Sequence, residues 1–179
     1  MKTITVFGTS QSLEGSADYA EARRVGQLLG ATGYTVVTGG YDGSMEAVSR
    51  GAREAGARVI GVTLRIFDPK PANRWVDEEI KMADFFARLQ HMIQMGDGFL
   101  VLRGGIGTLT ELALTWSLLQ TKSIAPKPMI VVGESWRAVI ESFRPHLIIR
   151  EHDWRWLRLA RDADEAVSQL RQSLESGMT

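Results

Sequence analysis

The stretch that decides the fold is "DGFLVLRGGIGTLTELALTW", residues 97–116. Its apolar run, 98–102, stops at three glycines within four positions, and an apolar helical pattern follows from residue 108. An apolar strand that turns through glycines into a helix is typical of a parallel sheet covered on both faces. We therefore read the stretch as one strand–loop–helix unit of an α/β fold.

The same kind of unit recurs along the chain. Continuous apolar runs occupy 3–7, 35–39, 58–63, 98–102 and 128–132. Helix-length segments lie between or after them, at 17–30, 44–55, 81–95, 108–121, 134–143 and 162–174. Strands that alternate with helices predict one domain over residues 1–179, an α/β fold with a three-layer, doubly wound, mostly parallel, Rossmann-like sheet. The non-periodic segment 64–80 is either a lid or pocket wall, or a surface connection.

Composition narrows the function classes. Lys plus Arg and Asp plus Glu number 21 each, so the net charge is zero and favours neither nucleic acid nor a membrane surface as partner. There is no cysteine, and three histidines lie far apart, so we expect no metal. The first residues read directly into a strand without signal-peptide features, and we expect a cytoplasmic protein.

Two glycine-rich loops follow predicted strands, at 38–47 and 103–111. Neither the G-x-G-x-x-G dinucleotide pattern nor a P-loop occurs. In the second loop, Gly104, Gly105 and Gly107 let backbone N–H groups approach an anion, and the following helix adds its positive end. Thr108 is expected to cap that helix and to donate to a phosphate oxygen. The alternative is a tight turn in which Thr108 and Glu111 form a capping box.

Glu111 lies one helical turn beyond this loop. A bound phosphate would repel its carboxylate unless the carboxylate served another part of the ligand. Ribose hydroxyls and an attacking water are suitable partners for it. A capping role is the simpler alternative.

The segment 88–111, "RLQHMIQMGDGFLVLRGGIGTLTE", resembles the signature of the LOG family, the cytokinin riboside 5′-monophosphate phosphoribohydrolases once labelled lysine decarboxylase-like. Residues 39–63 resemble the second glycine loop of that family, and the resemblance covers about residues 3–132. It implies a Rossmann-like homodimer that hydrolyses a nucleoside 5′-monophosphate, such as AMP or an N6-modified AMP, to base and ribose 5-phosphate without a cofactor.

Carried over, the resemblance makes Arg88 and Glu111 the catalytic pair. Arg88 would neutralise the phosphate or polarise the leaving base. The substrate and its phosphate are expected on Gly104, Gly105, Ile106, Gly107, Thr108, Gly40, Gly43, Ser44, Met45 and Ser10. Asp42 and Glu46 are candidates for a second carboxylate.

Two departures from the family pattern stand out. Arg103 replaces a Pro, which adds a phosphate contact or only a solvated charge, and Leu89 replaces a Lys common in plant-type members. Molybdenum-cofactor carrier proteins have a similar glycine loop, so a carrier that holds a cofactor phosphate without catalysis is the main alternative. A nucleotide-binding member without turnover is the third.

Overall fold

A computed structural model describes residues 1–177, so the last two residues of the expected domain lie outside it. Its seven strands form one sheet in the order β4-β3-β2-β1-β5-β6-β7. Every neighbouring pair is parallel. The strands are β1 (Thr3–Phe7), β2 (Thr35–Thr38), β3 (Val59–Leu64), β4 (Glu78–Met82), β5 (Gly98–Val101), β6 (Met129–Val132) and β7 (Arg158–Ala160). The predicted doubly wound α/β fold is confirmed.

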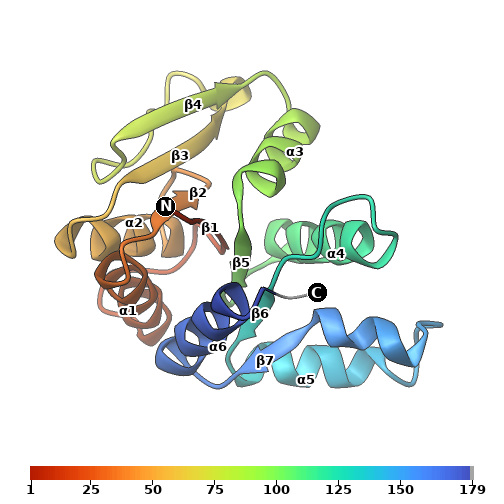
Figure 1. The fold of residues 1–179 in the computed structure, drawn as a ribbon. Coiled ribbons are helices and arrows are strands. Elements are labelled where there is room, and N and C mark those ends of the chain that lie inside the picture. The colour runs from red at the N-terminus through yellow and green to blue at the C-terminus, as the bar shows by residue number, and fades with distance from the viewer. Residues whose placement is uncertain (178–179) are drawn as a thin grey trace.

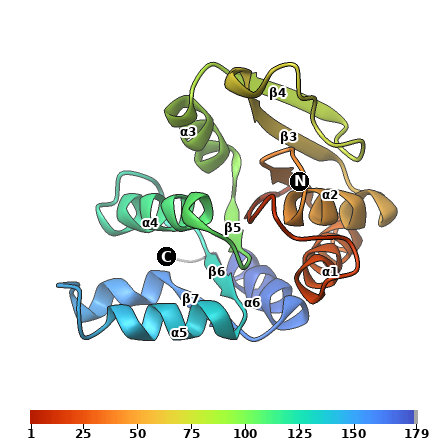
Figure 2. The ribbon, with the colours of Figure 1, turned by 180° about the vertical axis from the view of Figure 1, so that it is seen from behind.

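The helices form the two outer layers. They are α1 (Ala17–Ala31), α2 (Ser44–Glu54), α3 (Phe85–Met95), α4 (Ile106–Gln120), α5 (Glu134–Phe143) and α6 (Ala163–Glu175), with short 3₁₀ turns η1 (Arg65–Phe67) and η2 (Glu151–Trp156). Figure 1 shows α1, α2 and α6 on one face of the sheet, and Figure 2 shows α3, α4 and α5 on the other. Within residues 1–177, no helix has the length and apolar character needed to span a bilayer.

The continuous apolar runs follow from this double cover. In β1, Ile4 and Val6 pack into the cluster beneath α1, α2 and α6, whereas Phe7 packs into the opposite cluster. Alternate residues of a strand face opposite sides, so a strand buried on both faces has no polar side. Phe7 stacks on Phe99 of β5 with ring centroids 5.9 Å apart.

Two elements depart from the sequence prediction. Residues 81–82, expected in a helix, end the edge strand β4, and α3 begins only after Asp84, whose side chain accepts the Ala87 N–H. The short strand β7 was not predicted. Both strands lie at the edges of the sheet, and in β4 the polar residues Glu79 and Lys81 are exposed, so neither strand has the continuous apolar pattern of the central ones.

Glycines bring α1 and α2 into backbone contact. A Cβ added at Gly26 would lie 2.1 Å from the Val48 carbonyl oxygen, and one at Gly51 would lie 2.0 Å from that of Arg23. This packing places the start of α2 beside the loop after β1. There the Ser44 N–H and hydroxyl both donate to the Thr9 carbonyl at 2.9 Å.

The chain reverses its direction of winding at β1. After β1 it builds β2, β3 and β4 on one side, and then returns to add β5, β6 and β7 on the other. The following helices also leave on opposite faces, α1 after β1 and α4 after β5. The loops that leave β1 and β5 therefore diverge and leave a crevice at the carboxyl edge, where open α/β sheets bind their ligands.

Candidate active site

A pocket of about 330 Å³ opens at this carboxyl edge. The loop after β1, the start of α2, the end of β3 with η1, the first turn of α3 and the start of α4 all contribute to it. Its lining comprises Gly8, Thr9, Ser10, Gln11, Tyr41, Met45, Leu64, Phe67, Phe85, Arg88, Gly105, Ile106, Gly107, Thr108 and Glu111. The reversal of strand order thus places an open pocket beside both diverging loops.

Arg88 of α3 and Glu111 of α4 meet in this pocket. Arg88 Nη1 lies 3.8 Å from Glu111 Oε1, and each residue is only 7% exposed. The guanidinium is also held by the backbone, since Nε donates to the Val62 carbonyl at 2.6 Å and Nη2 donates to that of Gly39 at 3.2 Å. A Cβ at Gly39 would lie 2.1 Å from Nη2, so glycine there makes room for the guanidinium.

Burial controls the charge of this pair. It raises the pKa of Glu111 to about 7, against the opposing effect of the Arg88 charge. Burial also lowers the pKa of Arg88, and the Glu111 charge counteracts that shift. Among residues 1–177, no group donates a hydrogen bond to the Glu111 carboxyl. A carboxyl group that titrates near neutral pH suits proton transfer.

The start of α4 has no side-chain cap. The helix begins at Ile106 with Gly105 as its N-cap, and no side chain within residues 1–177 bonds to its first N–H groups. The predicted Thr108 cap and the alternative capping box with Glu111 are both wrong, because the helix starts two residues earlier than expected. The Thr108 hydroxyl is instead buried without a hydrogen-bond partner in the described chain. Unbonded N–H groups at a helix start attract anions.

The glycines of this loop have different surroundings. A Cβ at Gly104 would lie 2.0 Å from Thr108 Oγ1, so Gly104 makes room for that hydroxyl. A Cβ at Gly105 or Gly107 would meet no atom within 4 Å and would project into open space. A cradle therefore lies over these two glycines, next to the Thr108 hydroxyl.

The structure brings most of the expected site residues together. Arg88 and Glu111 share the pocket with Gly105, Ile106, Gly107, Thr108, Met45 and Ser10. Gly104 lines an adjoining pocket instead. Gly40, Gly43 and Ser44 do not line the main pocket. Gly40 and Gly43 adopt positive φ angles, and a Cβ on Gly43 would lie 2.4 Å from the Thr9 carbonyl oxygen, so these residues shape the loops behind it.

The structure also shows where the candidate second carboxylates and the non-periodic segment 64–80 lie relative to the pocket. Asp42, a candidate second carboxylate, is exposed and forms an ion pair with Lys70, and Glu46 does not line the pocket. Leu64 and Phe67 show that the non-periodic segment is a pocket wall at its start, while the rest of it connects β3 to β4. Sequence reasoning missed Thr9, Gln11, Tyr41, Phe67 and Phe85. These residues lie just after strand ends or near the start of a helix, and that position was the sequence signal that could have predicted them as pocket residues.

Comparison with known proteins shows to which family the chain belongs. Residues 45–170 match the model of the family described as "Possible lysine decarboxylase". A "Cytokinin riboside 5'-monophosphate phosphoribohydrolase" of Rhodococcoides fascians is 30% identical over 156 residues, which cover 84% of this chain and 75% of that protein. The chain belongs to this lysine decarboxylase-like, or LOG, family.

Two further proteins extend the comparison of this LOG-family chain. A "Pyrimidine/purine nucleotide 5'-monophosphate nucleosidase" of Escherichia coli strain K12 is 30% identical over 171 residues, or 88% of this chain. The match spans only 38% of the length of that relative. The structure of a molybdenum cofactor binding protein from Rippkaea orientalis superposes with a TM-score of 0.77 at 22% identity, with 96% of both chains covered. This likeness shows a shared fold.

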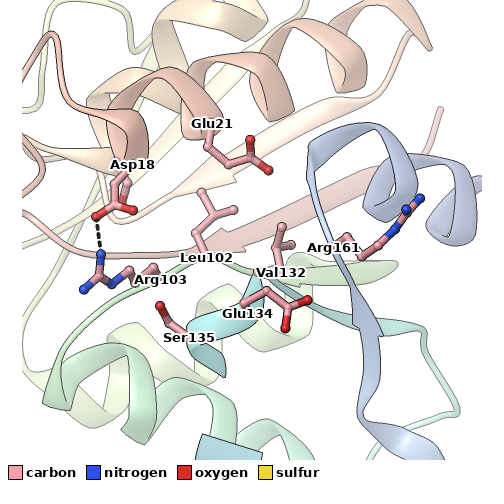
Figure 3. A pocket seen from close by; sticks show the side chains of 10 residues that line it. Asp18, Glu21, Leu102, Arg103, Val132, Glu134, Ser135 and Arg161 are labelled. Atoms are coloured by element: carbon pink, nitrogen blue, oxygen red, sulfur yellow. Dashed lines mark hydrogen bonds and ion pairs between the residues drawn. The ribbon is translucent and has the colours of Figure 1, made fainter. Parts of the chain in front are cut away.

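On the other side of its glycine loop, the LOG-family chain has two smaller pockets. One of about 280 Å³ lies between the loop after β1 and Gly104, and one of about 210 Å³ lies beyond Leu102. Arg103 and Asp18 border both, with Nη1 and Oδ2 3.2 Å apart (Figure 3). Arg103 thus lies outside the pocket that holds Arg88 and Glu111.

Proposed function

We propose that the chain hydrolyses the N-glycosidic bond of a nucleoside 5′-monophosphate, AMP or an N6-modified AMP, to free base and ribose 5-phosphate. One observation carries the proposal: the buried Glu111, with Arg88 3.8 Å away, faces the same pocket as the uncapped start of α4. The two relatives compared above, whose names describe cleavage of nucleoside monophosphates, support this activity.

In the proposed complex the 5′-phosphate lies over Gly105 and Gly107. The N–H groups at the start of α4 and the Thr108 hydroxyl donate to its oxygens. Neither set of donors has a side-chain partner among residues 1–177, and the open space over the glycines admits a phosphate. The nucleoside then extends toward Tyr41, Phe67 and Phe85, which line the same pocket with aromatic surface suited to a base.

The reaction requires water to attack C1′ of the ribose. The new C–O bond forms as the C1′–N bond breaks, and the base leaves with the bonding electron pair and gains a proton. The Glu111 carboxylate accepts the proton of the attacking water and stabilises positive charge on the ribose ring in the transition state. Two nitrogens of Arg88 are bonded to backbone carbonyls, and its Nη1 faces Glu111, which supports a role in holding that carboxylate.

We also propose that two copies of the chain form a homodimer. Large apolar side chains are exposed at the starts of two helices that contribute to the pocket, with Phe86 of α3 81% exposed and Ile106 of α4 80% exposed. Exposed apolar side chains of this size suit contact with a second copy of the chain.

The decisive test is chromatographic detection of free base. Pure protein is incubated with AMP, other nucleoside monophosphates and N6-isopentenyladenosine monophosphate. We expect the wild type to release base, and Glu111→Gln to reduce release by about 10³-fold or more. The exposed Glu141→Gln on α5 is the matched control and should behave as wild type.

Other outcomes separate the alternatives. Folded wild type that releases no base from any nucleotide would overturn the hydrolase proposal. Retained AMP binding in that case would leave a nucleotide-binding protein. Copurifying molybdenum with pterin fluorescence would instead identify a cofactor carrier.

A further inference from the structure

The peptide unit between Gly39 and Gly40 connects Arg88 to the interior of the protein. Its carbonyl, from Gly39, accepts a hydrogen bond from Arg88 Nη2 at 3.2 Å. Its N–H, from Gly40, donates to the Thr38 hydroxyl oxygen at 3.1 Å. Because a peptide unit is planar, the bond to its N–H also fixes the direction of its carbonyl.

This peptide unit depends on its hydrogen bonds for its orientation. Both of its residues are glycines, Gly40 has a φ of 77°, and glycine offers little steric resistance to rotation of the plane. The next carbonyl is held separately, since the Asn73 N–H and Nδ2 donate to that of Gly40 at 2.7 and 3.2 Å. Asn73 therefore holds the path of the loop, whereas Thr38 orients the plane of the peptide that contacts Arg88.

The Thr38 hydroxyl is itself held in one orientation. Thr38, at the end of β2, and Ser49 of α2 are both 0% exposed, and their hydroxyl oxygens lie 3.3 Å apart. Ser49 donates its proton to the Met45 carbonyl at 2.8 Å, so Thr38 is the donor between the two hydroxyls. The Thr38 oxygen is thus left as an acceptor for the Gly40 N–H.

From this series of contacts we infer that Thr38 is a positioning residue of the proposed active site. Through the Gly39–Gly40 peptide, its hydroxyl keeps the Arg88 guanidinium beside Glu111. The inference rests on the proposed function, in which the Glu111 carboxylate accepts a proton from water. Arg88 and Tyr41 are the other titratable side chains that line the pocket within residues 1–177, so the position of Arg88 governs the charge around Glu111.

Thr38→Val tests the inference, because it removes the hydroxyl and keeps the size and branching of the side chain. If Arg88 moves about 1 Å farther from Glu111, the midpoint of the Glu111 titration should rise by about 0.5–1 pH unit. A carbon-13 NMR titration of the glutamate carboxyl groups measures this midpoint, with the Glu111 signal identified by its loss in Glu111→Gln. Release of base from AMP should fall about 3- to 10-fold at pH 6 and stay within about twofold of wild type at pH 9.

Two variants separate positioning from a loss of packing. Thr38→Ser keeps the hydroxyl and should match wild type in both measurements. Thr63→Val is the matched control, because Thr63 of β3 is also 0% exposed, but its hydroxyl donates to Glu79 Oε1 at 2.6 Å. It should leave the Glu111 titration unchanged. Thr38→Ala removes the same hydroxyl without adding a methyl group, and should reproduce the result of Thr38→Val.

The NMR titration decides the inference without reference to activity. A Glu111 midpoint that is the same in Thr38→Val and wild type, or one that Thr38→Ser raises equally, would overturn it even if wild type releases base. Slower release at every pH with an unchanged midpoint would also overturn it. A raised midpoint in Thr38→Val, combined with no base release by folded wild type, would support the positioning of Arg88 and refute the proposed function.

Discussion

At the residue scale, α4 contains two buried polar side chains with few partners among residues 1–177: the Thr108 hydroxyl has no hydrogen-bond partner, and the Glu111 carboxyl has the Arg88 guanidinium 3.8 Å away. Burying such groups unpaired costs stability. Their shared position on one pocket therefore points to a ligand that supplies the missing partners. The same helix shows the ordinary solution in Thr115, whose buried hydroxyl donates to the Glu111 backbone carbonyl at 2.7 Å.

The unpaired Thr108 hydroxyl predicts that one substitution has opposite effects on stability and on AMP binding. Thr108→Val should leave the free energy of unfolding unchanged or raise it by about 0.5–1 kcal/mol, because an unpaired polar atom is removed. The same change should weaken AMP binding about tenfold. Thr115→Val is the control, and should lower stability by about 1 kcal/mol without an effect on AMP. Urea unfolding and calorimetry measure both; a large stability loss in Thr108→Val would contradict the prediction.

Glu111 predicts a pH dependence of stability. Its folded-state pKa of about 7 lies above the ordinary value of 4.5, so between these pH values the folded state binds the additional proton. The free energy of unfolding of wild type, relative to Glu111→Gln, should therefore fall by about 1–3 kcal/mol as the pH rises from 4.5 to 7. Below 4.5 and above 7 the difference should be constant. Urea titrations of both proteins from pH 4.5 to 8 measure it, and a constant difference throughout would refute the buried carboxyl.

At the element scale, the sequence predicted what continuous apolar runs specify. The five central strands β1, β2, β3, β5 and β6 follow from those runs, whereas β4 and β7 could not be read from the sequence because edge strands are short or half polar. The loop 103–111 predicted an anion site, but the start of α4 was misplaced because Thr108 looked like a cap. The 3.8 Å approach of Arg88 and Glu111 depends on how α3 and α4 pack, which no local pattern specifies.

Two helix glycines should respond differently to alanine. Gly107→Ala should raise the free energy of unfolding by up to about 1 kcal/mol, since alanine favours a helix and the site is open. Its methyl group fills the cradle, so base release and AMP binding should be lost. Gly51→Ala should instead cost about 2–3 kcal/mol, because its Cβ would meet the Arg23 carbonyl of α1. Thermal unfolding with the base-release assay tests both, and normal AMP binding by Gly107→Ala would exclude a phosphate over that glycine.

At the scale of the whole molecule, the site is assembled across the reversal of strand order. Residues from the loops after β1 and β2, and from the start of α4 after β5, share one pocket although more than 90 residues separate the first from the last. The order of elements predicted this edge as the ligand site. Of the aromatic wall residues, Phe67 was the hardest to predict, because its place depends on how the irregular segment after β3 folds back, whereas Tyr41 follows the end of β2 and Phe85 begins α3.

The exposed apolar side chains at the starts of α3 and α4 predict the mass of the protein in solution. Light scattering should give twice the 19.8 kDa of one chain. Phe86→Asp should yield single chains, because a charge would then be buried at the contact between copies. Val139→Asp on α5 is the control and should leave the mass unchanged. A wild type of one-chain mass at micromolar concentration would show that these side chains have another role.

The position of β1 also governs how the protein is made. Ile4 pairs with Val36 on one side and with Gly98 on the other, so one edge of the central strand stays open until more than half of the chain has been synthesised. Parallel pairings over such distances form slowly and expose the nascent protein to aggregation. β1 therefore waits for its second neighbour until β5 has been made, whereas β2 has both of its neighbours as soon as β3 has been made.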